Sequence, residues 1–192
     1  VIFVNRYFYP DMSATSQMLS DLAFDLASEG VEIVVVTSRQ CYENPKESLP
    51  KSDSVSDVKV YRVWTTRFGR SNLVGRAIDY LSFYPLAFLT LLRVVHKNDV
   101  IIAKTDPPLV SVIALMAAKL KRAKLVNWLQ DIFPEVAEVL GVLKSKRLVS
   151  LIKWLRNISL RQASMNVVLG ERMMERICAQ GVDHSKVRII PN

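Results

Sequence analysis

The amino-acid sequence predicts an α/β protein with a doubly wound, mainly parallel sheet of about seven strands and helices on both faces. Two observations lead to this fold class. Short apolar runs of strand length alternate along the whole chain with longer segments of helical periodicity, and the connections between them are mostly short. Half of the 192 residues are apolar, which is enough for one large domain or two small ones to bury a core. Such alternation is typical of parallel strands that are connected by helices packed on the sheet.

The first part of the chain predicts three strands, one helix and one long loop. Gly30 ends the helix, since glycine readily adopts the left-handed conformation found at helix ends. A polar stretch rich in proline and serine precedes the third strand and predicts a long mobile loop. In chain order, the elements are a strand at 1–4, a helix at 13–28, a strand at 31–37, the loop at 39–57 and a strand at 58–64.

The second part of the chain continues the alternation. The first of its helices is apolar and contains Pro85, where we expect a kink or a break because proline lacks the backbone N–H. Pro107 and Pro108 are expected to open the next helix. In chain order, the elements are a helix at 73–96, a strand at 100–104, a helix to about 122, a strand at 124–129, a helix beginning at Pro134, a basic helix from Ser145, a strand at 165–169, a helix at 171–180 and a strand at 187–190.

The net charge of +8 is unevenly distributed along the chain. No acid occurs between Glu138 and Glu171, and the basic residues there alternate with apolar residues at helical spacing. Trp154 lies among basic residues on one side of this predicted helix, an arrangement that suits the surface of an anionic bilayer. A solvated surface helix whose tryptophan packs locally fits the pattern equally well. A nucleic-acid partner is not expected. The membrane interpretation assigns bilayer contact to Lys146, Arg147, Lys153, Trp154 and Arg156.

Nothing in the sequence predicts export. Cys41 and Cys178 lie far apart and in no metal-binding or redox spacing, which is typical of free thiols in a reducing compartment. The chain starts directly with an apolar strand and shows no secretion signal, so the cytoplasm is the expected location. The apolar stretch at 73–95 contains charges and a proline, so it is not expected to span a bilayer. Its surplus of apolar surface needs a partner, which could be the protein core, the membrane interface or another chain.

Several common catalytic motifs do not occur in the sequence. Both glycine-rich phosphate loops, G-x-G-x-x-G and G-x-x-x-x-G-K-[ST], are missing, and so is the G-x-S-x-G of serine hydrolases. The first strand-to-helix connection instead carries residues 9–15, whose small side chains precede helix amides that could hold an anionic or hydroxylated ligand. His96 and His184 have no neighbours at ligand spacing. The sequence therefore predicts neither a metal nor a cofactor.

Three strand-to-helix loops are expected to meet at one edge of the sheet. They are residues 9–15, 104–108 and 130–135. In a parallel sheet these loops emerge together at the carboxyl ends of the strands, which is where ligands bind in open α/β folds. Asp131 comes just after an apolar strand and should point into the resulting crevice.

Helix capping is the structural alternative for the acidic and hydroxyl residues of these loops. Asp131 stands before the helix predicted to begin at Pro134, so its side chain could cap that helix. Asp11 or Ser13 could cap the first helix in the same way. Position in the sequence does not distinguish capping from ligand binding.

Five segments are distinctive when they are taken together in their order along the chain. They are Tyr9-Pro10-Asp11, residues 26–37, Asp106-Pro107-Pro108, residues 130–135 and residues 187–192. Together they resemble the GT-B glycosyltransferases, specifically the amino-terminal half of the retaining, sugar-nucleotide-dependent family four. The loop at 130–135, with its Asp-x-Phe-Pro-Glu pattern, looks most like the bacterial branch that builds exopolysaccharide and O-antigen sugars on lipid carriers.

The resemblance implies one half of a GT-B fold. Residues 1–192 would form the amino-terminal, Rossmann-like domain that binds the acceptor, and the nucleotide-sugar-binding domain would follow beyond Asn192. The complete enzyme would move a sugar from a nucleoside diphosphate to an acceptor hydroxyl with retained anomeric configuration and without a metal. Because the donor domain is not in this chain, we expect the chain alone to be inactive.

The resemblance also suggests roles for residues of the three loops. Asp131 is the best candidate for orienting the acceptor or accepting its proton, and Glu135 would support the loop. Many relatives have two glycines where this chain has residues 12–15, which argues against direct contact with the donor phosphate there. The expected substrate-binding residues are Asp11, Ser13, Ala14, Thr15, Lys104, Asp106 and Glu135.

The implied partners are a nucleotide-sugar donor, bound through the missing domain, and a lipid-linked or glycan acceptor. A polyprenyl-diphosphate acceptor would place the protein on the inner face of the plasma membrane, where the apolar and basic helices could dock. The sequence leaves two other functions open. One is a membrane-associated acceptor-binding module that works with a separate catalytic chain, and the other is a GT-B-like sugar-nucleotide epimerase.

Overall fold

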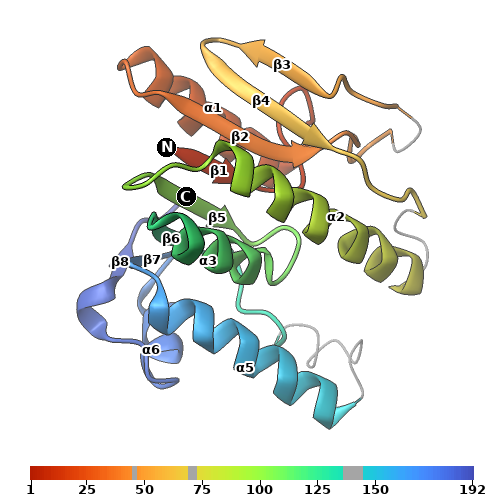
Figure 1. Cartoon of the computed structure of the whole chain (residues 1–192). Coiled ribbons are helices and arrows are strands. Elements are labelled where there is room, and N and C mark those ends of the chain that lie inside the picture. Colours follow the sequence, from red (N-terminus) through yellow and green to blue (C-terminus); the bar gives the residue numbers. More distant parts are fainter. Residues whose placement is uncertain (45–46, 69–72, 136–144) are drawn as a thin grey trace.

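The computed structural model describes residues 1–44, 47–68, 73–135 and 145–192 and shows one sheet with helices on both faces (Figure 1). The strand order is β3-β4-β2-β1-β5-β6-β7-β8, and every neighbouring pair is parallel except β3 and β4. This order confirms the predicted α/β class with a doubly wound, mainly parallel sheet. The strands are β1 (Ile2–Val4), β2 (Ile33–Ser38), β3 (Ser52–Val55), β4 (Val58–Val63), β5 (Val100–Lys104), β6 (Lys124–Trp128), β7 (Met165–Val168) and β8 (Val187–Ile189).

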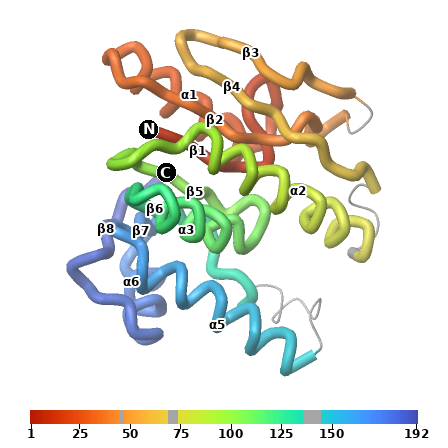
Figure 2. The backbone as a smooth tube through the Cα atoms, in the orientation of Figure 1, coloured from red at the N-terminus to blue at the C-terminus, as the bar shows by residue number. Residues whose placement is uncertain are grey.

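The chain winds outward from β1 in two directions, as Figure 2 shows. It first passes through α1 and β2 to the hairpin of β3 and β4, and α2 then carries it back to the other side of β1. The winding direction reverses between β1 and β5, and open α/β sheets bind ligands beside the carboxyl ends of such strands. The helices are α1 (Ala14–Ser28), α2 (Leu73–Val94), α3 (Val110–Lys121), α5 (Lys146–Gln162), α6 (Glu171–Cys178) and the short 3-10 helix η1 (His184–Lys186).

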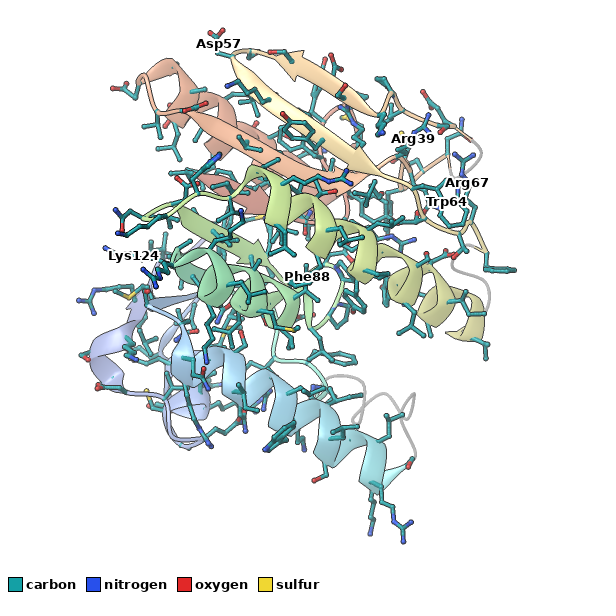
Figure 3. The ribbon with its side chains drawn as sticks, in the orientation of Figure 1. Arg39, Asp57, Trp64, Arg67, Phe88 and Lys124 are labelled. Atoms are coloured by element: carbon teal, nitrogen blue, oxygen red, sulfur yellow. The ribbon has the colours of Figure 1, made fainter. Side chains whose placement is uncertain are left out.

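Alternating strand residues separate the cores on the two faces of the sheet. On β1, Ile2 and Val4 pack in the core that α2 and α3 cover, whereas Phe3 packs in the core that α1 covers. Phe88, labelled in Figure 3, is a half-buried residue of α2 that packs against the core shared with α3. Helices α2, α3 and α5 lie side by side on one face, and α1 covers the other (Figure 1).

The structure adds a strand within the segment that the sequence predicts as a loop. Ser52–Val55 forms β3, which pairs antiparallel with β4 at the edge of the sheet. Ser56 and Asp57 turn this hairpin with positive φ angles of 48° and 62°, a conformation typical of tight hairpin turns (Asp57 in Figure 3). The loop prediction at 39–57 is therefore wrong for these residues. Backbone pairing forms the strand while its polar side chains stay exposed, so no apolar pattern marks it.

The structure corrects two expectations that rest on prolines, namely the break of the helix at Pro85 and the start of the next helix at Pro107. Helix α2 runs without a break through Pro85, which is exposed. Water can solvate the carbonyl that proline leaves without a helical partner, so the helix continues. Helix α3 begins at Val110, after Leu109 in a left-handed conformation, and not at the two prolines. The helix expected to begin at Pro134 falls mainly outside the described residues.

Helix α2 combines a buried side with an apolar exposed side. By length and composition alone, Val74–Val94 could cross a membrane. In the structure this helix lies on the sheet instead, because Phe83, Ala87 and Leu91 are completely buried in the core. The predicted surplus of apolar surface is thus partly absorbed by the core.

Candidate functional site

The three predicted loops meet at the carboxyl edge of the sheet. The Nζ of Lys104, at the end of β5, donates to the carbonyl of Thr15 in the first turn of α1 at 3.1 Å. Thr105, Asp131 and Phe133 line one crevice, which brings the loops after β5 and β6 together. The loops after β1, β5 and β6 therefore converge, as the sequence predicts.

A small crevice, open to solvent, lies between the ends of β5 and β6 and the start of α3. The loops after β5 and β6 line it directly, and the loop after β1 approaches it through its contact with Lys104. The chemically relevant residues of its lining are Lys104, Thr105, Asp131, Phe133 and Arg156.

Asp131 is the crevice carboxylate that a ligand can reach most directly, because the residue is exposed. The surrounding protein removes part of the water around its carboxyl group and raises its pKa, and the neighbouring polar side chain of Thr105 opposes this shift. A carboxylate with a raised pKa is a stronger base. Asp131 therefore combines accessibility with basicity, which suits a group that orients or deprotonates a hydroxyl.

Asp106 supplies a second carboxyl close to the first. The residue is half-buried, and burial raises the pKa of its carboxyl to about 6, which Arg6 opposes and the charge of Asp131 reinforces. The backbone N–H of Arg6 donates to the Asp106 carbonyl at 2.7 Å and holds this loop against the end of β1. The charge of Asp131 therefore disfavours the ionised form of Asp106.

Lys104 is a buried cation at the base of the crevice. Only 1% of its surface is exposed, and its Nζ lies 4.0 Å from the centroid of the Trp128 ring. Burial lowers the pKa of its ammonium group to about 8. No carboxylate among the described residues forms an ion pair with it. Its contacts are thus the ring and the Thr15 carbonyl, and they leave donor capacity for a ligand.

The loop after β1 is held together by Asp11. This buried carboxylate accepts hydrogen bonds from the backbone N–H of Ser13 at 2.8 Å, from the Ser13 hydroxyl and from the backbone N–H of Tyr42. Ser13 occupies the N-cap position of α1, but its side chain makes no capping hydrogen bond. Ala14 is exposed and Thr15 is half-buried. Asp11 therefore shapes the loop, while Ala14 and Thr15 remain accessible.

Glu135 forms an ion pair with Arg156 below the crevice. The two carboxylate oxygens accept from the guanidinium at 2.7 and 3.0 Å, and Arg156 also donates to the Phe133 carbonyl at 3.1 Å. Burial raises the pKa of Glu135, but the hydrogen bonds and the charge of Arg156 outweigh it and lower the pKa overall. Arg156 is almost completely buried, so its assignment to the membrane-facing set is corrected: it points toward the crevice.

The other residues of the predicted membrane-facing set do not point toward the crevice as Arg156 does. Lys146 and Arg147 are exposed at the start of α5, Lys153 is half-buried and Trp154 is 60% exposed. Helix α5 thus presents Arg156 to the crevice on one side and a basic, tryptophan-containing surface on the other.

A buried polar network beside Asp106 is not among the predicted site residues. Arg6 donates to Gln40 at 2.9 Å and to Asp79 at 3.3 Å, and its guanidinium lies 5.0 Å from the centroid of the Tyr80 ring. Asp79 also accepts from the Thr66 hydroxyl at 2.7 Å. Two sequence signals mark this network: Arg6 comes two residues after the first strand, and Asp79 is the only acid of α2. Isolated charges in apolar segments are typical of buried pairs.

Known structures share this fold over the whole chain at low sequence identity. HepE from Anabaena, in complex with UDP and glucose, has a TM-score of 0.58 and 17% identity, and the match covers 100% of this chain and 43% of that one. Sucrose-phosphate synthase from Thermosynechococcus elongatus has a TM-score of 0.66 and 10% identity over 99% of this chain and 47% of that one. The catalytic domain of starch synthase IV from Arabidopsis thaliana, bound to ADP and acarbose, has a TM-score of 0.65 and 10% identity over 100% of this chain and 51% of that one.

The chain thus spans about half the length of these GT-B structures. No protein with curated annotation has a significantly similar sequence. Residues 14–192 match the family described as the glycosyl transferase 4-like domain. Because this match covers nearly the whole chain, including β2 to β8, the chain belongs to the glycosyl transferase 4-like domain family.

Proposed function

We propose that this chain is the acceptor-binding half of a retaining glycosyltransferase that moves a sugar from a nucleotide sugar to an acceptor hydroxyl. The observation that carries the proposal is Asp131, an exposed carboxylate of raised pKa in the crevice of a glycosyl transferase 4-like domain. Family membership supports sugar transfer. The ligands of the similar structures, UDP-glucose in HepE and ADP in starch synthase IV, support a nucleoside diphosphate sugar as the donor.

In the proposed reaction, the acceptor oxygen forms a bond to the anomeric carbon of the donor sugar. The bond from that carbon to the diphosphate oxygen breaks, and the diphosphate leaves with its electron pair. Asp131 orients the acceptor hydroxyl and accepts its proton. The donor binds to a second domain outside this chain, and no metal takes part.

Neighbouring residues prepare this carboxylate for its role. Thr105 lies beside Asp131 in the crevice, and the Glu135–Arg156 pair fixes the same loop from below. The cation of Lys104 lies at the base of the crevice, where it would attract an anionic part of the substrate. The remaining proposed substrate contacts are Asp106 and the residues at the start of α1, namely Ser13, Ala14 and Thr15, in the loop that Asp11 shapes.

We further propose that the acceptor is lipid-linked, that it serves cell-surface polysaccharide synthesis, and that the protein works on the inner face of the plasma membrane. The outward side of α5 supports this location, because Lys146, Arg147 and Trp154 are exposed there and the helix contains no acid. Anionic headgroups attract clustered lysine and arginine, and tryptophan favours the membrane interface.

The central test replaces Asp131 in the complete protein that contains this domain. Asp131→Asn should lower kcat about 100-fold or more, because the amide cannot accept the proton. Binding of the nucleotide sugar, measured by calorimetry, should not change, because the donor site lies in the other domain. Asp21→Asn, an exposed position on α1, is the matched control and should leave kcat unchanged.

Full transfer by the Asp131→Asn protein would refute the proposed role of this residue. An epimerised donor sugar without any glycosylated acceptor would instead identify an epimerase. The chain of residues 1–192 alone should transfer no sugar, and steady turnover by it would show that the donor site is not in a separate domain.

A further inference from the structure

The neighbouring helices α2, α3 and α5 carry almost no negative charge. Helices α2, α3 and α5 contain a single acid, Asp79, which is 1% exposed and paired with Arg6. Helix α1 on the opposite face has the reverse pattern, with two acids, Asp21 and Asp25, and neither lysine nor arginine. The exposed basic residues of the three helices are Arg93, Lys119, Lys146, Arg147 and Arg161. The α2–α3–α5 surface is therefore strongly basic and would attract an anionic partner.

The same surface exposes large apolar side chains. Along α2 they follow helical spacing, and the most exposed is Leu81 at 66%. Soluble surface helices normally present polar residues at such positions. The exposed apolar residues of α2 are Val74, Ile78, Leu81 and Leu89. Helix α5 adds Leu148, Leu151 and Trp154, and α3 adds Met116 and Leu120.

The opposite side of α2 is anchored in the protein. Phe83, Ala87 and Leu91 are completely buried between this helix and the sheet, and Asp79 joins the network of Arg6. The helix can therefore lie in the plane of a bilayer with its exposed line of residues immersed, but it cannot cross the bilayer without leaving the core.

We propose that the outer surface of α2, α3 and α5 docks on an anionic lipid bilayer, with apolar contact mainly from α2 and charge mainly from α5. Apolar residues flanked by basic ones are typical of helices that lie in the interface of anionic membranes. A second copy of this chain fits the surface poorly, because two such surfaces would bring like charges together. The proposal extends the membrane location from one helix to three, and it rests on the proposed function only for its biological purpose.

Docking by this surface would also orient the crevice. Helices α2 and α5 follow the ends of β4 and β6 along the chain, so both begin at the carboxyl edge of the sheet. In Figure 3, Trp64 and Arg67 mark this edge and Lys124, the first residue of β6, marks the opposite one. A bilayer against α2 and α5 would therefore lie beside the opening that contains Asp131, within reach of a lipid-linked acceptor.

Vesicle flotation measures the docking without any sugar substrate. The chain should float with vesicles enriched in phosphatidylglycerol at low salt, and it should stay unbound with phosphatidylcholine alone or at high salt. Vesicles containing brominated lipid should quench Trp154, and Trp154→Phe should abolish that quenching while Trp64 and Trp128 remain.

Two variants separate the apolar contribution from the charge. Leu81→Gln with Leu89→Gln should weaken vesicle binding about tenfold or more, because two immersed side chains are lost. Lys146→Glu with Arg147→Glu should weaken binding by a similar factor and remove most of its salt dependence. Both pairs are exposed, so circular dichroism should show unchanged folding.

Matched controls make the outcome specific to this surface. Ile190→Gln removes an exposed apolar side chain elsewhere, and Lys51→Glu with Arg172→Glu changes the net charge by the same amount as the α5 pair. Both controls should bind vesicles as the parent chain does. Vesicle binding that survives both α2 and α5 variants, or that is equally weakened by the controls, would overturn the proposal. So would a stable dimer in solution that the Leu81 and Leu89 changes dissociate.

These results are independent of sugar transfer. A complete protein that loses vesicle binding in the α2 variant should still glycosylate a soluble acceptor analogue. Loss of transfer with Asp131→Asn at unchanged vesicle binding would concern the crevice alone.

Discussion

Arg156 of α5 and Glu135 of the Asp131 loop form a bidentate ion pair, with Nη1–Oε2 and Nη2–Oε1 distances of 2.7 and 3.0 Å. Arg156 is buried and Glu135 is half-buried, so the pair is shielded from water on the side of α5. The guanidinium also holds the Phe133 carbonyl. A single side chain thus fastens the loop that carries the proposed proton acceptor to the helix that carries the proposed bilayer contact.

Breaking this pair should loosen the loop and remove an acid-sensitive part of the stability. Glu135→Gln should lower the free energy of unfolding at pH 7 by about 1–3 kcal/mol, since charged hydrogen bonds are lost. The pKa of Glu135 is lowered on folding, so its contribution is present above the ordinary pKa of about 4.3 and is lost as pH falls through the folded value. Urea unfolding at neutral and acid pH measures both effects.

Glu171→Gln is the matched control for this substitution, because Glu171 is exposed on α6. It should change stability little at either pH. A difference between parent and Glu135→Gln that stays the same in acid would contradict the assignment of the effect to the ionised pair.

Substitution of one member of the buried Arg6–Asp79 pair should cause one of the largest losses in the free energy of unfolding. Asp79→Ala leaves the Arg6 guanidinium buried without its carboxylate, which should cost about 3–5 kcal/mol in the free energy of unfolding. The double change Arg6→Met with Asp79→Leu should recover most of this loss, because it removes both charges. Chemical denaturation of the parent, the single variant and the double variant tests the expectation. Asp25→Ala, at an exposed position on α1, is the control. Equal losses in the single and double variants would contradict it.

The buried ammonium group of Lys104 should lower the free energy of unfolding while it supplies a positive charge at the crevice. Burial lowers its pKa to about 8, so Lys104→Met should raise the free energy of unfolding at pH 7 by about 2 kcal/mol after the lost Thr15 hydrogen bond is subtracted. Between about pH 8 and its ordinary pKa of about 10.4, the unfolded chain binds more protons than the folded one. The stability of the parent should therefore rise with pH in that window relative to Lys104→Met.

Thermal unfolding against pH, together with kcat of the complete protein, distinguishes the two contributions of Lys104. We expect Lys104→Met to gain stability and to lose sugar transfer. Lys51→Met, at an exposed position, should change neither. A Lys104→Met protein that is both less stable and fully active would contradict this account.

Asp106 should make stability fall as pH rises through mildly acid values. Its folded pKa of about 6 exceeds the ordinary value, so the folded protein binds an extra proton between about pH 4 and 6. Above this window the buried charge costs up to about 3 kcal/mol, which Asp106→Asn should remove. The difference in stability between parent and variant, followed from pH 4 to pH 7 by urea unfolding, should grow with pH in about this range. Asp57→Asn, an exposed turn residue, should show no such change.

The strands and the crevice could be predicted from the sequence because each has a local signal. Apolar runs mark seven strands, and the alternation with helices brings the loops after β1, β5 and β6 to one edge. The edge strand β3 has no such signal, since backbone pairing with β4 forms it while Ser52, Asp53 and Ser54 stay exposed. The break expected at Pro85 does not occur, because the exposed position lets water solvate the carbonyl that has no helical partner.

The sequence by itself determined the order of elements, the α/β class, and the placement of Asp131 at the end of a buried strand. These follow from periodicity and from parallel-strand geometry, which act over neighbouring residues. Only the tertiary structure decided which charges meet. Arg156 faces Glu135 and not a membrane, Asp11 binds its own loop, and Lys104 lies unpaired by any described carboxylate against Trp128. These outcomes depend on contacts between segments far apart in the chain, and no local pattern encodes the distance between them.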